Sequence, residues 1–393
     1  MNYNFDELIE RKNTDSSKWD NVGARIGNPD ALPMWVADMD FRCPQPVIDA
    51  VVKKAQFGVY GYPVVPARFA EVTAQWQRRR HNWQVEPKDV VYVTSVIPAM
   101  FSAVQAFTES GDKVLLQRPV YYPFSHAVEQ QGRIIENCPL QLADGRYEID
   151  FDALERQAAD PAVKLMLLCN PHNPVGRVFT REELMRIGEI CCRHGVVIFS
   201  DEIHADFVYT GHVHVPLASI SDEIAQNTVT AVAPSKTFNL AGMRTGAMII
   251  SNPKLRVRIS QVLNRNRSAL PSVLGLEAYM AAYSAGEPYL KELVPYLEKN
   301  IAYLDRTLCE RMPRIHLIHP EGTYLMWLDC REMGLSNEDL DHFFTWEAAV
   351  ALDKGFWFGT EGSGFMRMNI ACPRQRLAQA LGAIETAYQR RLG

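Results

Sequence analysis

The sequence predicts an α/β protein with two parts: a large domain whose mostly parallel sheet is covered by helices, and a smaller α+β domain. Strand-like and helix-like segments alternate between residues 90 and 251. Two of the strand-like segments, 164–169 and 196–200, are almost continuously apolar, which is typical of strands buried on both faces. Past about residue 268 long helical patterns replace the strands, and a short mixed unit follows.

Turn residues and helix signals delimit the elements of the large domain. Residues 46–57 and 98–110 are expected to be helices, and each is followed by a glycine. Thr180 and Glu183 have the spacing of a capping box, so a helix is expected to begin there and to end at Gly195. The strands expected between the helices cover residues 90–94, 113–116, 133–136, 164–169, 196–200, 229–233 and 247–251.

In the smaller unit a helical pattern through residues 290–312 precedes two strands and a last amphipathic helix over 375–392. The two strands are expected at 323–328 and 365–370. We therefore predict a large domain over 49–285 and a small domain over 286–393, with residues 1–48 packed against the small domain. In that first segment Trp35 and Phe41 are expected to be buried, and Asp38 and Asp40 to need hydrogen-bond partners.

Composition narrows the class of protein. Of the 393 residues 47% are hydrophobic and 22% are charged, which is ordinary for a globular protein. The net charge is −5 and there is no long basic run, so nucleic acid is not an expected partner. No signal peptide or membrane-spanning run is evident, which favours the cytoplasm. The eight cysteines show no Cys-x-x-Cys pair, so we expect free thiols and no metal site.

The most informative stretch is 233–246, which lies between two predicted strands and contains Ser235, Lys236 and Arg244. A buried ammonium is costly without a partner, so a lysine at this place is expected to have a lowered pKa. Such an amine is suited to form a Schiff base with a carbonyl compound. The serine and the arginine could bind a phosphate. A lysine in an ordinary surface loop would also fit the pattern.

Polar residues follow two of the other buried strands. Asp201 comes directly after one strand, and Asn173 lies in an Asn-Pro-His-Asn-Pro-Val-Gly sequence after another. In a sheet of this kind ligands bind beyond the carboxyl ends of the strands. Asp201 could equally cap a helix or join a core salt bridge, and the asparagines could simply form a tight turn.

Together these motifs resemble those of the fold-type-I pyridoxal-phosphate (PLP) enzymes, in the order and spacing of that family and over nearly the whole chain. The resemblance implies that Lys236 carries PLP and that Ser235 and Arg244 contact its phosphate. It also implies that Asp201 keeps the pyridine nitrogen protonated, which makes the ring an electron sink. Asn173 would contact the phenolic oxygen.

Other positions also receive a role from this resemblance. Tyr121 would lie flat on the cofactor ring, and Tyr62 would reach the phosphate in the neighbouring subunit of a homodimer. Arg367 would bind the α-carboxylate of an amino-acid substrate, with Ala37 beside it. Further phosphate contacts would come from a loop in which many relatives have a glycine and this chain has none: Ser95, Val96 and Ile97.

Three segments, 33–41, 200–204 and 233–239, resemble the MalY-type carbon–sulfur β-lyases more than the aminotransferases. Most aminotransferases have a tyrosine where this chain has His204, which would lie near the ring without an assigned proton transfer. The resemblance implies β-elimination from L-cysteine S-conjugates such as L-cystathionine, giving a thiol, pyruvate and ammonia, with Lys236 taking the Cα proton. Arg244 is usual in aminotransferases, so that activity stays an alternative, as does a non-catalytic PLP-fold regulator.

Overall fold

A seven-stranded sheet forms the centre of the larger part of the protein, whose computed structural model describes residues 3–392. The strand order is β2-β10-β9-β8-β7-β3-β4. Strand β10 runs antiparallel to both of its neighbours and the other pairs are parallel, which confirms the predicted mostly parallel sheet. The strands are β2 (Val90–Val93), β3 (Lys113–Leu116), β4 (Ile134–Asn137), β7 (Val163–Cys169), β8 (Val197–Asp201), β9 (Thr228–Val232) and β10 (Gly246–Ile249).

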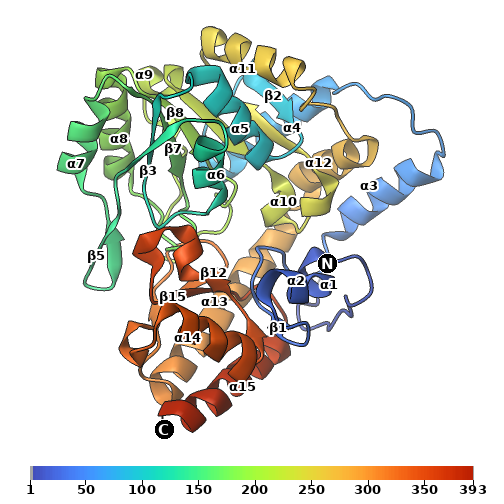
Figure 1. Ribbon diagram of the computed structural model, residues 1–393. Helices are drawn as coiled ribbons and strands as arrows, with labels where there is room; N and C mark the ends of the chain where they lie inside the picture. Colours follow the sequence, from blue (N-terminus) through green and yellow to red (C-terminus); the bar gives the residue numbers. More distant parts are fainter. Residues whose placement is uncertain (1–2, 393) are drawn as a thin grey trace.

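Helices cover both faces of this sheet (Figure 1). Strand β7 shows why its sequence is continuously apolar: Leu165 and Leu167 pack in one hydrophobic cluster, and Met166 and Leu168 pack in the cluster on the opposite face. The first cluster contains residues of α5 (Val96–Phe107), α6 (Pro123–Glu129) and α11 (Pro253–Arg265). The second contains residues of α7 (Phe151–Ala158), α8 (Arg181–His194) and α9 (Asp222–Gln226).

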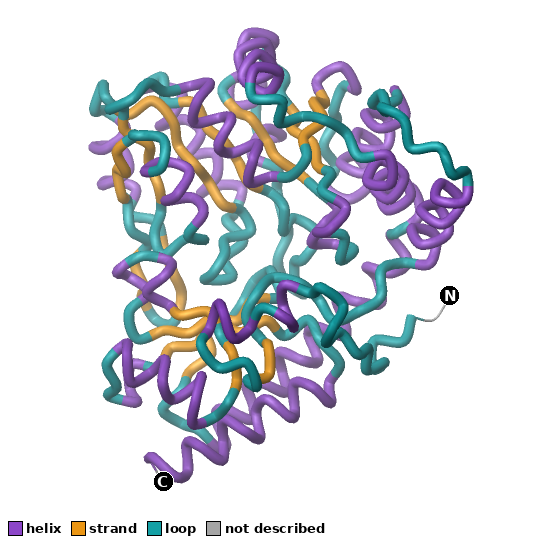
Figure 2. Tube along the Cα trace, turned by 45° about the vertical axis from the view of Figure 1, so that its right-hand side comes forward, coloured by secondary structure: helices purple, strands orange, loops and turns teal. Residues whose placement is uncertain are grey.

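A four-stranded antiparallel sheet lies in the lower part of Figure 1, and Figure 2 shows the strands in the same two groups. Its order is β11-β12-β15-β14. The strands are β11 (His316–Ile318), β12 (Leu325–Asp329), β14 (Asp353–Lys354) and β15 (Phe365–Asn369). The helices of this region are α13 (Glu287–Arg311), α14 (Asn337–His342) and α15 (Arg374–Leu392), and α12 (Val273–Ala285) precedes them.

The first part of the chain packs on this smaller region. It contains α1 (Ser17–Asp20), α2 (Val22–Ile26) and β1 (Leu32–Pro33), and β1 pairs with β13 (Val350–Ala351). Trp35 and Phe41 are buried, as expected. Helix α3 (Gln45–Gln56) then leads to a loop on the outside of the molecule, drawn at the right of Figures 1 and 2. The domain boundaries at residues 49 and 286 stay a prediction.

Local structure departs from the sequence expectations in a few places. Helix α5 begins at Val96 rather than at Pro98, because a proline is tolerated in the first turn, where its missing N–H has no intrahelical partner. Helix α4 (Ala67–His81), which was not predicted, buries Phe69, Val72 and Trp76 along one side. The short hairpin β5 (Gln141–Ala143) and β6 (Arg146–Glu148) was not predicted either. The capping box at Thr180 and Glu183 is confirmed.

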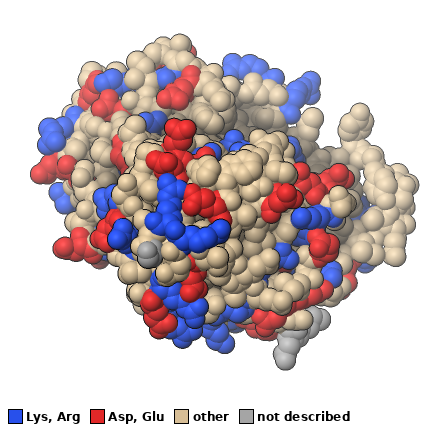
Figure 3. Space-filling model, turned by 60° about the horizontal axis from the view of Figure 1, so that its bottom comes forward, with Lys and Arg blue, Asp and Glu red and all other residues tan. Residues whose placement is uncertain are grey.

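The surface carries charges of both signs. On the face seen in Figure 3, Lys and Arg side chains lie among Asp and Glu side chains rather than in one large patch. Within residues 3–392 no helix is both long enough and apolar enough to cross a bilayer.

Candidate active site

A cavity lies beyond the carboxyl ends of β7, β8 and β9, where the sequence predicted a ligand site. Nearly all predicted site residues line it: Ala37, Ser95, Val96, Ile97, Tyr121, Asn173, Asp201, His204, Ser235, Lys236 and Arg244. Six further residues, to which the sequence analysis gave no role, complete the wall: Thr94, Phe124, Cys169, Ile203, Ala241 and Thr245. The structure therefore brings together side chains from segments that lie far apart in the sequence.

Lys236 lies on a single helical turn, α10 (Pro234–Thr237), directly after β9. Its Nζ donates a hydrogen bond to the backbone carbonyl of Ala37 over 2.7 Å. Burial lowers the pKa of Lys236 to about 8, and among the nearby charges Asp38 opposes this shift most, followed by Asp201. The structure agrees with the lowered pKa that the sequence predicted, so about a tenth of the amine is neutral at about pH 7.

Asp201 ends β8, and only 4% of its surface is exposed. The hydrogen bond to its carboxylate in the structure comes from the backbone N–H of Ile203 over 3.1 Å. Burial raises the pKa of this carboxyl to about 7, and the charge of Lys236 opposes the rise. A buried carboxylate with so little compensation is suited to a cationic donor, such as the protonated nitrogen of a pyridine ring.

Part of the cavity wall is rich in hydrogen-bond donors. Ser95 is the N-cap of α5, so the first amides of this helix, those of Val96 and Ile97, have no intrahelical acceptor. The cavity wall here also includes Ser235 and Arg244. A helix N-terminus with a hydroxyl and a guanidinium nearby fits a phosphate group. The cavity wall thus contains both donors suited to a phosphate and a buried carboxylate, as a phosphorylated pyridine requires.

His204 and Tyr121 also form part of the cavity wall. Burial, with the charges of Lys236 and Arg367, holds the pKa of His204 well below its ordinary value. The imidazole is therefore neutral, and its Nδ1 has no hydrogen-bond partner among the described residues. Burial raises the pKa of Tyr121, so its phenol stays protonated.

Arg367 lies beside the cavity rather than in its wall. It projects from β15, its surface is 1% exposed, and its Nη1 donates to Asn173 Oδ1 over 2.9 Å. Its other partners are the Trp35 carbonyl and the carboxylate of Asp353, with which it forms a buried ion pair. The sequence analysis missed Asp353. The available signal was a carboxylate directly after the apolar residues 350–352, but β14 consists of only two residues, both of them charged.

Tyr62 is the predicted site residue that the chain does not bring to its own cavity. It lies in the exposed loop between α3 and α4, and its side chain is fully exposed. The prediction that it serves a neighbouring subunit is therefore not tested by a single chain. Within residues 3–392 no group of three or more His, Cys, Asp or Glu side chains is arranged to hold a metal ion.

Comparison with known proteins indicates the same family as the sequence motifs. Residues 34–384 match the family model of aminotransferase class I and II. The cystathionine beta-lyase PatB of Bacillus subtilis is 44% identical over 98% of this chain and 99% of its own length. The structure of cystalysin from Treponema denticola, which contains pyridoxal 5'-phosphate, has a TM-score of 0.96 and 35% identity, and the match covers 99% and 100% of the two chains.

A PLP-bound C–S lyase from Staphylococcus hominis is also similar, with a TM-score of 0.91 and 31% identity over 98% of each chain. These matches span nearly the full length of both this chain and its relatives, so they cover the large sheet, the small sheet and the cavity alike. The chain belongs to the class I and II aminotransferase family of fold-type-I PLP enzymes.

Proposed function

We propose that the protein is a PLP-dependent carbon–sulfur β-lyase that cleaves L-cysteine S-conjugates such as L-cystathionine. One observation carries the proposal: the amine of Lys236, with a pKa lowered to about 8, lies in the same cavity as the buried carboxylate of Asp201. The relative of 44% identity is named a cystathionine beta-lyase, and one of the similar structures is named a C–S lyase.

Hydrogen-bond donors of the cavity wall would hold the cofactor phosphate: Ser95, the amides of Val96 and Ile97, Ser235 and Arg244. Asp201 would hold the ring nitrogen, with Tyr121, Asn173 and His204 around the ring. When bound, PLP supplies an electron sink for the negative charge that develops at Cα of the substrate. His204, which is neutral, adds no further positive charge to the ring.

The substrate's α-carboxylate would lie against Arg367, whose guanidinium is fixed by Asp353 and Asn173. The neutral amine of Lys236 takes the Cα proton. The Cβ–S bond then breaks and the electron pair leaves with the sulfur, which takes up a proton in place of the one removed from Cα and is released as a thiol. The remaining aminoacrylate hydrolyses with one water to pyruvate and ammonia.

Two alternatives use the same cavity. An aminotransferase would also need Lys236 and Asp201, and Arg244 is compatible with that activity. A non-catalytic regulator would have no need of a buried lysine whose pKa is lowered. The segments that resemble the MalY-type enzymes favour the lyase over both.

The test supplies the purified, PLP-loaded protein with L-cystathionine and follows pyruvate with and without an added keto acid. The lyase is expected to form pyruvate and a thiol in equal amounts without any keto acid. Turnover that requires the keto acid would identify an aminotransferase. If the PLP-loaded protein shows neither activity, and L-cysteine S-conjugates of other sizes are not turned over either, the non-catalytic regulator is the remaining alternative.

We also propose that the working unit is a homodimer with shared active sites and that it acts in the cytoplasm. The loop that contains Tyr62 exposes several large apolar side chains, which single chains seldom leave in water. They are Phe57, Val59, Tyr60, Tyr62 and Val64. With Tyr62 at the partner's phosphate, each cavity would be completed by the other chain.

A further inference from the structure

The backbone segment of residues 36–41 forms one side of the lysine's surroundings. Its Ala37 carbonyl accepts the 2.7 Å hydrogen bond from Lys236 Nζ and a second one, over 3.3 Å, from the hydroxyl of Tyr324. The hydrogen bond to this carbonyl therefore positions the free amine of Lys236. The proposed mechanism leaves this segment without a role beyond contact with the substrate.

Two asparagine side chains hold the segment from opposite sides. Asn239, three residues after the lysine, accepts from the N–H of Met39 and donates to the carbonyls of Met39 and Phe41 over 2.8 and 2.9 Å. Asn369, two residues after Arg367, donates to the carbonyls of Val36 and Asp38 over 2.7 and 2.9 Å. The lysine turn and the strand that bears Arg367 are thus joined through the same short stretch of backbone.

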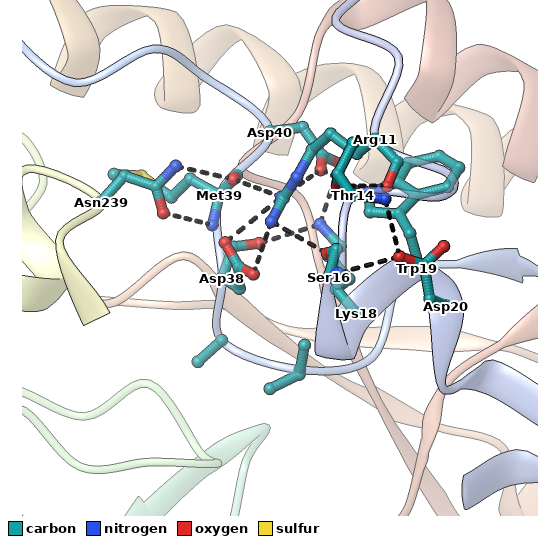
Figure 4. Close-up of polar contacts among 12 residues, drawn as sticks. Arg11, Thr14, Ser16, Lys18, Trp19, Asp20, Asp38, Met39, Asp40 and Asn239 are labelled. Carbon is teal, nitrogen blue, oxygen red and sulfur yellow. Dashed lines mark hydrogen bonds and ion pairs between the residues drawn. The ribbon is translucent and has the colours of Figure 1, made fainter. Parts of the chain in front are cut away.

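A third anchor comes from the first residues of the chain (Figure 4). Arg11 binds both oxygens of Asp38, over 2.8 and 3.3 Å, and also reaches Asp40 Oδ1 and the Met39 carbonyl over 2.9 and 3.0 Å. Lys18, which is completely buried, donates to the Asp38 carbonyl and to Asp40 Oδ2, each over 2.8 Å. The partners that Asp38 and Asp40 were expected to need are present.

The two carboxylates depend on Arg11 to different degrees. Asp40 keeps an ion pair with Lys18 and a hydrogen bond from Trp19 Nε1 even without the arginine. The carboxylate of Asp38 has Arg11 as its side-chain partner, and it is about a quarter exposed. Loss of Arg11 would therefore leave Asp38 as an unpaired negative charge while Asp40 stays compensated.

Asp38 is also the charge that most favours the ammonium form of Lys236. The other charged groups that act on this amine are Arg367, which disfavours the ammonium, and Asp201, which favours it. The remaining titratable groups around the amine are the neutral imidazole of His204 and the phenol of Tyr324, whose pKa burial raises. Asp38 thus acts on the charge state of Lys236 in the opposite sense to Arg367, and Arg11 is the cation that pairs with Asp38.

We propose that Arg11 is a positioning residue of the reaction: by pairing with Asp38 it fixes the backbone that holds the Lys236 amine, and it offsets the charge of a carboxylate that is one residue from the carbonyl binding that amine. This inference rests on the proposed role of Lys236 as the proton acceptor. Unpaired, Asp38 would keep a larger fraction of the amine protonated, and that fraction cannot take the Cα proton. Without Asp38, the amine would lose its protons more readily.

The test is a titration of the free Lys236 amine by NMR in cofactor-free, full-length protein labelled with ¹³C at lysine Cε, the resonance being assigned by its loss in Lys236→Ala. The wild-type midpoint is expected at about 8. Arg11→Gln is expected to raise the midpoint and Asp38→Asn to lower it. Arg42→Gln is the matched control, because it removes a bidentate ion pair, with Glu7, at the exposed surface directly after the segment.

Opposite signs distinguish positioning from a general loosening of the segment. A merely structural role would admit water in both variants and move both midpoints upward, toward the ordinary lysine value, which would overturn the proposal. So would midpoints in Arg11→Gln and Asp38→Asn that match the Arg42→Gln control. Thermal unfolding of each variant checks that the fold is intact, and Arg11→Lys, which keeps the charge, should stay closer to wild type than Arg11→Gln.

A second readout uses the PLP-loaded protein. Arg11→Gln is expected to move the acidic limb of the kcat profile for thiol release to higher pH, with a loss of up to about fivefold near neutral pH and little change in KM. A loss that lies in KM alone would assign Arg11 to substrate binding instead and contradict the proposal. Because the titration needs no turnover, failure of the lyase assignment and failure of this inference are separate results.

Discussion

Asp201 and Lys236 show how one physical cause prepares two residues for different tasks. Desolvation raises the pKa of the carboxyl to about 7 and lowers that of the amine to about 8, so each group moves toward its neutral form. A cationic ring nitrogen beside Asp201 would restore the carboxylate. The amine of Lys236 needs no such partner, because its neutral form is the one that accepts a proton.

The raised pKa of Asp201 predicts a cost to stability in the cofactor-free protein. The pKa of this carboxyl is about 7 in the folded protein and 3.8 ordinarily. Its contribution to the stability of the folded state is therefore fully present below about pH 3.8 and is lost as the pH rises through about 7. Asp201→Asn should therefore make the cofactor-free protein more stable, by up to about 4 kcal/mol at about pH 8 and by less at about pH 5. Urea unfolding at the two pH values measures the difference.

With PLP bound, the stability difference between Asp201→Asn and the wild type changes sign, because the variant lacks the carboxylate that pairs with the ring nitrogen. The same substitution should then reduce stabilisation by the cofactor and slow the proton transfer from Cα. Equal stability of the variant and the wild type in the cofactor-free state at both pH values would show that burial does not raise the pKa of Asp201.

At the scale of elements, the sequence was most informative where a local pattern fixes the outcome. The continuous apolar run of β7 predicts burial on both faces, and Thr180 with Glu183 marks the start of α8. Helix α4 was missed although Phe69, Val72 and Trp76 follow helical spacing, because three arginines and a histidine near its end obscure that pattern.

The pairings around the site could not be predicted in the same way. Asp201, Asn173 and Lys236 follow strands of one sheet, so their meeting at its edge follows from topology. Arg367 meets Asp353, and Arg11 meets Asp38, through contacts that no periodicity links. The sequence indicated that Asp38 needed a partner, but not which cation would supply it, because short loops place the donors.

At the scale of the whole molecule, the site lies where three parts of the chain meet. The large sheet supplies Lys236 and Asp201, the small sheet supplies Arg367, and the first segment supplies Ala37. The exposed loop between α3 and α4 would add a fourth part, from a second chain. This loop extends away from the body of its own chain (Figure 1), and its apolar side chains are exposed.

Mixing two inactive variants tests this shared site. Tyr62→Ala and Lys236→Ala homodimers should each be inactive. In a hybrid dimer both substitutions fall in one active site, and the second active site is intact. Each hybrid should regain up to about half of the wild-type activity, as two-fold symmetry requires. Subunit exchange is verified separately by mass-tagged chains. Exchange without recovery would show that each site is built within one chain.

The most direct test of the central claim, that the Lys236 amine takes the Cα proton before the C–S bond breaks, is thiol release by Lys236→Ala loaded with PLP. We expect the rate from L-cystathionine to fall by about 10²-fold or more, the usual contribution of a positioned proton acceptor. Small primary amines added to the solution should restore part of it, with a dependence on amine basicity, since they can occupy the vacated space. Thiol release within about tenfold of the wild type in the absence of added amine, a barrier change of only about 1.4 kcal/mol, would contradict the assignment of Lys236.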